Sequence, residues 1–371
     1  MSTRARNVVI AAGGTAGHVV PALAVAQALR AEGAEVAFIG AARAEAQLVP
    51  DAGFTLHAIG AEGLSRSDPR RALAALARAA AATLRAARIL RALSPDAVMG
   101  AGGYVAGPVV LAALARRTPV LLTEADSRLG LTNRLLAPFA RRVCLSFPPR
   151  GRLERRLARG ARGRGARKYV LTGRPIPFPL ADRAGARAGL ALRDDDTLVL
   201  VFGGSLGARS INEAAIAAFS PEESPARRVL HVCGRRDFDD LAKRPLRDGY
   251  ELVAYLDVSD FERALAAADL AVARAGGSVF EIAAYGVPAV LVPYPHAAGD
   301  HQSENARWMS DAGAAVTLPD GELTPERLAA EVRALLGDRE RRSAMSRAAH
   351  AIARPRAAFD VAHAVLEIAR R

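Results

Sequence analysis

Two glycine-rich segments of this chain have the composition of phosphate-binding turns. Gly13–Gly17 reads Gly-Gly-Thr-Ala-Gly, and Gly203–Gly207 reads Gly-Gly-Ser-Leu-Gly. Each follows a short apolar, β-branched run and precedes an alanine-rich amphipathic stretch, which is typical of a buried strand, a tight turn and a helix. The free N–H groups and the positive dipole end of such a helix attract anions, most often phosphate. The sequence therefore predicts two anion sites of the same design.

Side chains within these loops add to the backbone chemistry. The hydroxyl of Ser205 suits a diphosphate, and Thr15 and His18 could act in the same way in the first loop. His18 falls in the first turn of the expected helix, where it is either a structural residue or an acid–base group. A third glycine segment, Gly100–Gly103, also follows an apolar run and leads into Tyr104. Because parallel strands open their carboxyl ends on one edge, this segment and the first loop are expected to line one crevice.

Carboxylates stand at two further positions that are expected at a sheet edge or a helix start. Glu124 and Asp126 follow the run Val120–Leu122, so they are candidates for acid or base catalysis at the same edge. Glu281 belongs to a Ser-x-x-Glu pattern that begins at Ser278 and favours a helix start. Its carboxylate is interpreted either as part of a capping box or as a ligand of a ribose diol.

Polar residues after the run Ala289–Val292 suit a hydroxylated ligand such as a sugar. They are Asp300, His301, Gln302 and Asn305. The alternative is that Asp300 only caps a helix. Asp194–Asp196 has the composition of a metal-binding motif, but it precedes its strand and so falls at the wrong end of the sheet. The sequence therefore predicts no metal site.

The elements that must position these residues form an α/β pattern. Ten short apolar runs alternate with helical stretches, which indicates parallel sheets with crossover helices. A chain of 371 residues exceeds the size at which single cores stop growing. We therefore expect two doubly wound domains that face one another across a nucleotide-sized cleft. The runs are Val8–Ile10, Val36–Ile39, Ala97–Met99, Val120–Leu122, Val143–Leu145, Val199–Phe202, Val229–Val232, Leu252–Tyr255, Leu270–Val272 and Ala289–Val292.

The pattern breaks once, in a segment rich in proline, arginine and glycine between Ser146 and Pro179. We accordingly expect an N-terminal domain over 1–150, a linker over 151–180 and a C-terminal domain over 181–345. The remaining residues, 346–371, are expected to form a terminal helix, with Pro355 near its start, that packs back onto the first domain.

The charge of the chain indicates a polyanionic partner. The formal net charge is +13, and 49 of the 51 basic residues are arginines. Nucleic acid, anionic lipid and a phosphorylated substrate all fit this balance. A predicted helix over Pro69–Leu93 carries Arg71, Arg78 and Arg85 on one stripe, with Leu73, Leu76 and Leu84 opposite. That stripe is either a solvated face or a contact with an anionic membrane.

Targeting and redox signals point to the cytosol. The apolar run after Arg6 is too short for a signal peptide. The long uncharged stretch Ala97–Ala115 contains glycines and Pro108, so it reads as strand, loop and helix, and any membrane contact is expected to be peripheral. Cys144 and Cys233 form no disulfide or zinc pattern, which is consistent with a reducing compartment.

Taken together, these motifs resemble the UDP-N-acetylglucosamine–N-acetylmuramyl-(pentapeptide) pyrophosphoryl-undecaprenol N-acetylglucosamine transferases. The resemblance covers nearly the whole chain in the right order and spacing. Its matching blocks are Gly13–His18, Gly100–Pro108, Gly130–Asn133, Gly203–Asn212, Arg274–Glu281 and Asp300–Asn305.

The resemblance implies the GT-B fold, in which the C-terminal domain holds most of the UDP-sugar. It assigns the diphosphate to Ser205, the ribose to Glu281 and the uracil to the backbone of Leu256. The full donor set that it implies is Thr15, Gly17, Asp126, Ser205, Leu256, Arg274, Gly277, Glu281, His301 and Gln302. The acceptor set that it implies is Gly13, Gly14, Gly102, Gly103, Tyr104 and Asn133.

The chain departs from the family pattern at two places. The usual His-Glu-x-Asn after the fourth strand stands here as Thr123-Glu124-Ala125-Asp126. A basic residue that often follows the proline of the linker is replaced by Pro177. These changes weaken the assignment of a donor-phosphate contact to the linker, while Asp126 can still accept a hydrogen bond from a sugar hydroxyl.

The implied reaction moves N-acetylglucosamine from UDP to the 4-hydroxyl of the muramyl sugar of a lipid-linked diphosphate, with inversion. We expect His18 to be the general base, with Asp126 or Glu124 behind it, and neither a metal nor a cofactor. The expected partners are the UDP-sugar, the undecaprenyl-linked lipid and an anionic membrane at its cytoplasmic face, and not nucleic acid. The alternatives are another GT-B transferase with a lipid acceptor, such as a glycolipid synthase, a non-hydrolysing UDP-sugar epimerase, or a nucleic-acid-binding α/β protein.

Overall fold

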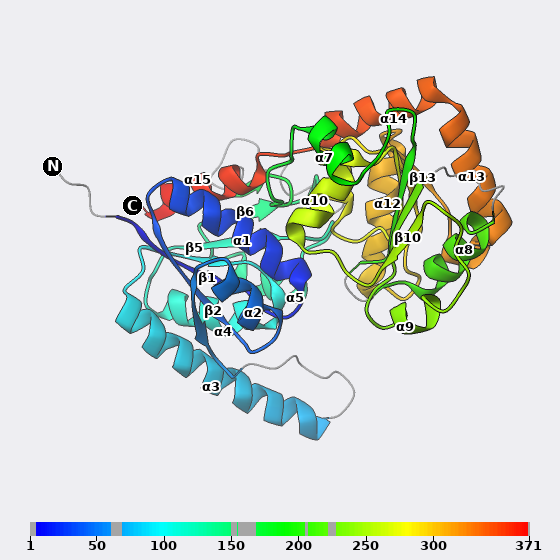
Figure 1. Ribbon diagram of the computed structural model, residues 1–371. Coiled ribbons are helices and arrows are strands. Elements are labelled where there is room, and N and C mark those ends of the chain that lie inside the picture. The colour runs from blue at the N-terminus through cyan, green and yellow to red at the C-terminus, as the bar shows by residue number, and fades with distance from the viewer. Residues whose placement is uncertain are drawn as a thin grey trace. The chain divides into compact units, whose positions relative to one another are not determined.

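The computed structural model describes residues 5–60, 69–149, 154, 168–204, 207–221 and 228–369. The chain divides into two compact units (Figure 1). Unit 1 comprises Met1–Pro177 and Pro355–Arg371, and unit 2 comprises Phe178–Arg354. Each unit is built on a parallel sheet, as the alternation of apolar runs predicts, and each is described by itself below.

Within the described residues, the sheet of unit 1 has seven strands in the order β3-β2-β1-β4-β5-β6-β7, and every pairing is parallel. Its strands are β1 (Asn7–Ala11), β2 (Glu35–Gly40), β3 (Thr55–Ala58), β4 (Ala97–Gly100), β5 (Val120–Glu124), β6 (Arg142–Leu145) and β7 (Tyr169–Leu171). Its helices are α1 (Ala16–Ala31), α2 (Ala44–Asp51), α3 (Pro69–Leu93), α4 (Gly103–Ala115), α5 (Leu131–Leu136) and α15 (Ala357–Ala369).

Helices cover both faces of this sheet, which is why its central strands are apolar throughout. One face packs against α1, α2 and α15, through side chains such as Leu29 and Val365. The other face packs against α3 and α4, through side chains such as Leu90 and Val109. In α3 the buried positions are spaced by four residues, and Leu84, expected on the face opposite the arginines, is instead 64% exposed.

The last helix of the chain, α15, completes unit 1. It packs against α1, and Arg142 of β6 forms a 3.0 Å ion pair with its Glu367. The change of unit falls between Arg354 and Pro355, nine residues later than the predicted start of this segment at 346. The reason is that α14 (Arg339–Ile352) continues unit 2, where its His350 fills the space beside Gly286.

Part of the predicted linker is structured. β7 pairs with β6, with Val143 opposite Tyr169, and unit 1 extends to Pro177. Most of the arginine- and glycine-rich segment, 150–153 and 155–167, lies outside the described residues.

The described part of unit 2 has a six-stranded parallel sheet in the order β10-β9-β8-β11-β12-β13. Its strands are β8 (Leu198–Phe202), β9 (Arg228–Val232), β10 (Tyr250–Val253), β11 (Leu270–Ala273), β12 (Ala289–Leu291) and β13 (Ala315–Thr317). Its helices are α7 (Arg183–Gly189), α8 (Arg209–Phe219), α9 (Phe238–Leu241), α10 (Val258–Ala267), α11 (Val279–Ala284), α12 (His301–Asp311), α13 (Pro325–Gly337), α14 and the 3-10 turns η1 (Ala298–Asp300) and η2 (Asp320–Glu322). Ile211 of α8 and Val332 of α13 belong to one core cluster, and Phe202 of β8 packs edge to face on Phe261 of α10.

Both sheets reverse their strand order beside the first strand of the unit. In unit 1 the reversal lies between β1 and β4, and in unit 2 between β8 and β11. The crevice outside the carboxyl ends of strands at such a point is where open α/β sheets bind ligands. The glycine segments follow β1, β4 and β8, so all three flank a reversal.

All ten predicted strands are present, and one of them is displaced by two residues: β10 covers Tyr250–Val253 instead of Leu252–Tyr255. Three further strands were not predicted from the sequence. They are the short edge strands β3, β7 and β13, whose residues are partly exposed. The stretch Ala97–Ala115 forms β4, a turn and α4, as expected. Within the described residues, no helix combines the length and the apolar character needed to cross a membrane.

Candidate functional site

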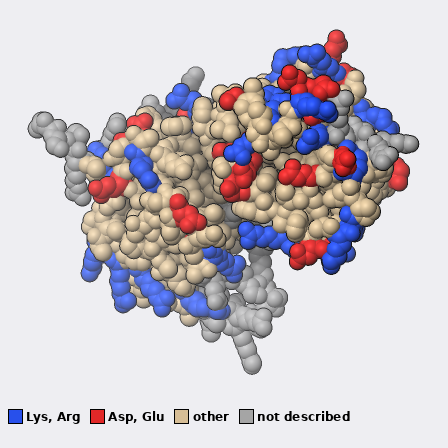
Figure 2. Space-filling view, in the orientation of Figure 1, with Lys and Arg blue, Asp and Glu red and all other residues tan. Residues whose placement is uncertain are grey.

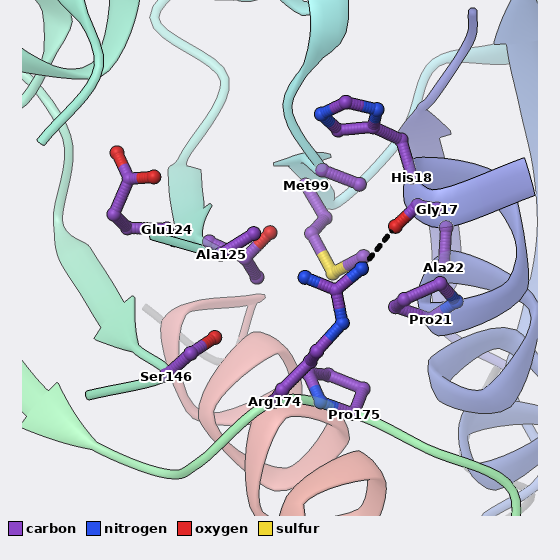
Figure 3. A pocket seen from close by; sticks show the side chains of 12 residues that line it. Gly17, His18, Pro21, Ala22, Met99, Glu124, Ala125, Ser146, Arg174 and Pro175 are labelled. Atoms are coloured by element: carbon purple, nitrogen blue, oxygen red, sulfur yellow. Dashed lines mark hydrogen bonds between the residues drawn. The ribbon is translucent and has the colours of Figure 1, made fainter. Parts of the chain in front are cut away.

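A pocket lies at the carboxyl edge of the sheet in unit 1 (Figure 3). Residues from α1, β4, β5 and the segments after β6 and β7 line it, so five parts of the unit converge there. They are Gly17, His18, Pro21, Ala22, Met99, Ala101, Thr123, Glu124, Ala125, Ser146, Arg174 and Pro175. The position at the strand-order reversal makes it the candidate site of this unit.

Two glycine segments meet beside this pocket. Gly14 has φ +112° and Gly103 has φ +73°, a region of backbone space that favours glycine. A Cβ atom at Gly103 would collide with the carbonyl oxygen of Gly13, so the two segments are in direct contact. A Cβ at Gly14 would lie 3.4 Å from the ring of Tyr104, which therefore covers the first loop. The prediction that both segments line one crevice is confirmed, since Gly17 of the first and Ala101 of the second line the same pocket.

A buried carboxylate holds the first loop. Glu45 in α2 is 0% exposed and accepts hydrogen bonds from the backbone of Gly14 (3.0 Å) and Ala41 (2.7 Å). The sequence reasoning missed this residue, because Glu45 stands in a helical stretch far from any glycine motif. A buried carboxylate must be hydrogen-bonded, and here its partners are the Gly14 amide of the first loop and the Ala41 amide that follows β2.

His18 lies in the first turn of α1 at the wall of the pocket (Figure 3). Its Nδ1 is 3.3 Å from the hydroxyl of Thr15, and a Cβ at Gly102 would approach its ring to 3.0 Å. Burial and the nearby Arg174 guanidinium lower the pKa of His18 below its ordinary value, while the Asp126 carboxylate opposes that shift. The imidazole is therefore held in its neutral, basic form at neutral pH.

Arg174 reaches the same pocket from the segment after β7. Its guanidinium donates a hydrogen bond to the carbonyl oxygen of Gly17, which Figure 3 marks with a dashed line. Sequence reasoning missed this contact also, since 157 positions separate the two residues along the chain.

Glu124 serves the loop that follows β5. The carboxylate is 6% exposed and accepts hydrogen bonds from the backbone of Asp126 (3.1 Å) and Gly130 (2.8 Å) and from the Asn133 amide (2.9 Å). Burial raises the pKa of Glu124, and these hydrogen bonds oppose the rise. Asn133 is also buried, and it donates a second bond to the carbonyl of Thr123.

This geometry bears on two of the expected roles. Both oxygens of Glu124 accept hydrogen bonds from the loop that follows β5, so the side chain holds that loop in place. Asn133, expected to bind acceptor, also directs its amide into that loop. Asp126 is exposed, and its negative charge acts on the His18 imidazole. Asp126 therefore remains the candidate carboxylate partner of His18. Thr15 is exposed, and its hydroxyl lies beside the imidazole.

In unit 2 the second glycine loop follows β8. Gly204 (φ +89°) and Gly207 (φ +76°) both require glycine, and a Cβ at Gly207 would collide with the carbonyl oxygen of Cys233. Among the described residues, none lies within 4 Å of a Cβ built at Gly204, and α8 begins at Arg209. Ser205, the expected diphosphate ligand, lies outside the described residues together with Leu206.

Arg274 after β11 is committed to contacts within unit 2. Its side chain donates to Asp320 (2.5 Å), to Ser210 (2.8 Å) and to the carbonyls of Val292 (3.2 Å) and Pro293 (3.3 Å). The residue is only 8% exposed. The guanidinium therefore joins the ends of β11 and β12 to α8 and η2.

The other residues of the expected donor set follow β10, β11 and β12. Glu281 lies in the first turn of α11, where the Ser278 side chain makes no capping hydrogen bond. Asp300 likewise makes no side-chain cap at α12. Gln302 accepts a hydrogen bond from the backbone of Tyr294 (2.9 Å), and the buried Asn305 donates one to Ala275 (3.0 Å).

These contacts leave the predicted donor set spread over two units. Leu256, Arg274, Gly277, Glu281, His301 and Gln302 follow three strands whose carboxyl ends share one edge of the unit 2 sheet. Thr15, Gly17 and Asp126, also expected to contact the donor, belong to unit 1. In the described parts of the chain, no three His, Cys, Asp or Glu side chains gather as a metal-binding group.

Comparisons with known proteins agree with this architecture. The glycosyltransferase family 28 N-terminal domain matches residues 8–145, and the family 28 C-terminal domain matches residues 198–361. A UDP-N-acetylglucosamine–N-acetylmuramyl-(pentapeptide) pyrophosphoryl-undecaprenol N-acetylglucosamine transferase of Moorella thermoacetica is 41% identical over 97% of this chain and 98% of the relative. The protein of the same name from Acidithiobacillus ferrooxidans is 42% identical, with 98% of each chain covered.

Solved structures place the chain in the same group. The crystal structure of Acinetobacter baumannii MurG is similar with a TM-score of 0.74 and 32% identity over 98% of this chain and 99% of that one. A UDP-GlcNAc 2-epimerase from Neisseria meningitidis reaches a TM-score of 0.67 over 97% of this chain and 100% of that one, at 13% identity, which shows a shared fold alone. The chain belongs to the UDP-N-acetylglucosamine–N-acetylmuramyl-(pentapeptide) pyrophosphoryl-undecaprenol N-acetylglucosamine transferases, two-domain glycosyltransferases of the GT-B fold.

Proposed function

We propose that the two units divide the work of the family reaction, with acceptor activation in unit 1 and donor binding in unit 2. The reaction moves N-acetylglucosamine from UDP to the 4-hydroxyl of the muramyl sugar in an undecaprenyl-diphosphate-linked muramyl pentapeptide, converting lipid I to lipid II. The observation that carries the assignment of unit 1 is the half-buried His18 in the pocket at the strand-order reversal. A neutral imidazole is the form that a general base requires.

In the proposed step, His18 takes the proton of the acceptor hydroxyl as its oxygen attacks the anomeric carbon. The bond from that carbon to the UDP oxygen breaks, UDP leaves with the electron pair, and the anomeric configuration inverts. In the tautomer whose Nδ1–H donates to Thr15, Nε2 is the nitrogen that accepts the proton. Asp126 then stabilises the imidazolium through its negative charge.

Gly13, Gly14, Gly102, Gly103 and Tyr104 form the rim of the proposed acceptor site. Support comes from the contact between the two glycine segments and from the position of Tyr104 over Gly14. Because the two glycine backbones lie directly against each other, without side chains between them, the loop surface has room for a bulky diphosphate or sugar.

In unit 2, we infer that the loop after β8 and the start of α8 hold the UDP diphosphate. In support, no described residue lies within 4 Å of a Cβ built at Gly204, beside the start of α8. Glu281, in the first turn of the helix after β11, is the proposed ribose ligand. Backbone amides and a helix dipole that face the departing diphosphate supply electrostatic stabilisation, so the proposed mechanism uses no metal or other cofactor.

The proposed setting is the cytoplasmic face of an anionic membrane, with unit 1 toward the lipid. Figure 2 shows basic side chains along the edge of unit 1 where α3 runs. Arg78 and Arg85 are exposed on that helix. A group of apolar side chains on and after α5 is also exposed: Leu131 by 55%, Leu135 by 63% and Phe139 by 69%. Exposed apolar groups with arginines suit a lipid interface.

An acceptor-dependence assay tests the proposed function. The protein is incubated with UDP-N-acetylglucosamine, with and without the undecaprenyl-linked acceptor, in the presence of EDTA. UDP release and lipid-linked disaccharide formation only with acceptor support the proposal. Formation of UDP-N-acetylmannosamine without acceptor would instead identify an epimerase, and activity that disappears with EDTA and returns with a divalent cation would overturn the metal-free mechanism.

A further inference from the structure

Arg174 and Asp126 bring opposite charges to His18 from two separate segments of unit 1. Arg174 follows β7 and Asp126 follows β5, and both act electrostatically on the imidazole.

We propose that Arg174 is a positioning residue for the transfer: it clamps the first turn of α1 through the Gly17 carbonyl and balances the charge that Asp126 brings to His18. The inference rests on the proposed function, since it concerns the base assigned there. Its geometric basis is the hydrogen bond from Arg174 to the residue directly before His18.

The contact does two things at once. Because Gly17 has no side chain, a hydrogen bond can hold only its backbone. A guanidinium can donate to that carbonyl and still keep N–H groups for other partners. The hydrogen bond fixes the turn that carries His18, and the guanidinium places its positive charge on the same pocket wall (Figure 3). Positive charge near an imidazole disfavours its protonation, whereas the Asp126 carboxylate favours it.

The other groups around His18 come from the loop before α1, from α4 with the turn before it, and from β5. Thr15 precedes α1 and contacts Nδ1, Gly102 before α4 faces the ring, and Tyr104 of α4 covers the neighbouring loop. Glu124 of β5 lines the same pocket but directs its oxygens to the loop amides. Arg174 and Asp126 are the charged groups whose effects on His18 the structure resolves, and they have opposite signs.

The first test follows the His18 imidazole by NMR titration of protein with labelled histidine. H18Q assigns the signal among the seven histidines. R174Q is expected to move the midpoint of the His18 titration to higher pH, and D126N is expected to move it to lower pH. The double variant R174Q/D126N is expected to return close to wild type. A midpoint unchanged in R174Q overturns the charge-balancing role.

The second test measures kcat/KM for the acceptor against pH in the same variants. If His18 is the base, the acidic limb of the profile moves in the direction of the titration, to higher pH for R174Q and lower for D126N. Loss of the clamp is also expected to reduce kcat at the optimum by up to about 10²-fold, the cost of misplacing a group by about 1 Å. R174K keeps the charge without the planar donor fork, so it should restore the limb but not the full kcat.

These two readouts separate the inference from the proposed function. If the His18 titration responds as expected in R174Q and D126N while the H18Q variant still turns over normally, the charge balance stays in place and His18 is overturned as the base. A normal titration midpoint and normal kcat in R174Q would overturn the inference while leaving the base untouched. Thermal unfolding of each variant checks that unit 1 is folded, and R174K provides the comparison if R174Q is unstable.

Discussion

The two Gly-Gly-x-x-Gly loops are nearly the same in sequence and differ in what supports them. In unit 1 the buried Glu45 carboxylate takes the amide of Gly14, and the loop leads to His18. In unit 2, Gly207 lies against the backbone of Cys233, whose carbonyl accepts a hydrogen bond from the Asn212 amide. That amide also donates to the Asp237 carboxylate, whereas in unit 1 the carboxylate itself accepts from the loop backbone. A carboxylate that accepts from a loop amide offsets the positive field of the loop at that point.

This difference indicates how one motif came to serve two purposes. The first loop places an imidazole in a pocket, which suits proton transfer. At the second, no described residue lies within 4 Å of a Cβ built at Gly204 beside the start of α8, which suits an anion. If the two loops act separately, a change in one should leave the function of the other intact.

The largest expected effect comes from removing the imidazole of the first loop. His18→Ala should lower kcat by about 10²–10⁴, the usual contribution of a positioned general base. Its affinity for UDP, measured by calorimetry, should stay unchanged, since the proposed donor loop belongs to unit 2. The control is His363→Ala, which removes an exposed histidine from α15 of the same unit. Near-normal turnover of His18→Ala would pass the role of base to Asp126.

The reciprocal change is made in unit 2. Glu281→Ala should raise the KM for the UDP-sugar by about 30- to 150-fold, because an unpaired ribose diol costs about 2–3 kcal/mol with a charged partner. The pH dependence of acceptor use should not move. Ser278→Ala is the matched control, since this side chain makes no capping bond. A loss of thermal stability in Glu281→Ala with unchanged KM would make Glu281 a structural residue only.

The support of the second loop predicts a pH effect on stability. Asn212 donates its amide to Cys233 and Asp237, so its oxygen accepts from Nε2 of the buried His231, whose Nδ1 in turn accepts from the Tyr250 hydroxyl. Burial lowers the pKa of His231 to about 3. In the unfolded chain His231 takes up a proton below its ordinary pKa of 6.5, whereas in the folded chain it stays neutral down to about pH 3. The free energy of unfolding therefore falls as the pH drops from 6.5 toward 3.

The expected loss is about 2–3 kcal/mol in the free energy of unfolding by about pH 4.5. Denaturant unfolding at neutral and acidic pH measures it, with His231→Gln as the variant that lacks the titrating group. The variant should be less stable at neutral pH and lose less on acidification. His363→Gln, at an exposed position, should behave as wild type. An equal acid sensitivity of wild type and His231→Gln would contradict this account.

Strands and glycine turns were predictable from the sequence because they depend on local patterns. The apolar runs predict strands such as β1 and β8, since buried parallel strands are apolar on both faces. The short edge strand β7 was not predicted, because Tyr169–Leu171 is partly exposed and lies beside an arginine-rich segment. The site was predictable where a residue belongs to a loop motif, as His18 does. Glu45 and Arg174 were missed because their roles arise from contacts made only when distant segments pack together.

The smallest expected effect per residue concerns the surface of unit 1. If the arginine stripe of α3 lies on anionic lipid, each charge contributes about 1 kcal/mol near the membrane surface, and salt weakens the binding. The triple variant R71Q/R78Q/R85Q should therefore sediment less with vesicles that contain anionic lipid and should show a higher apparent KM for membrane-embedded acceptor. Its activity on a water-soluble, short-chain acceptor should hardly change, since the pocket around His18 is untouched.

The matched control is R333Q/R339Q/R341Q, which removes the same charge from exposed positions on α13 and α14 of unit 2. If only net charge matters, both triple variants lose vesicle binding equally, and α3 has no special part in it. If unit 1 is the lipid-facing unit, only the α3 variant loses binding. Wild-type sedimentation of the α3 variant would make its stripe a solvated helix face and leave the exposed Leu131, Leu135 and Phe139 as the surface to test next.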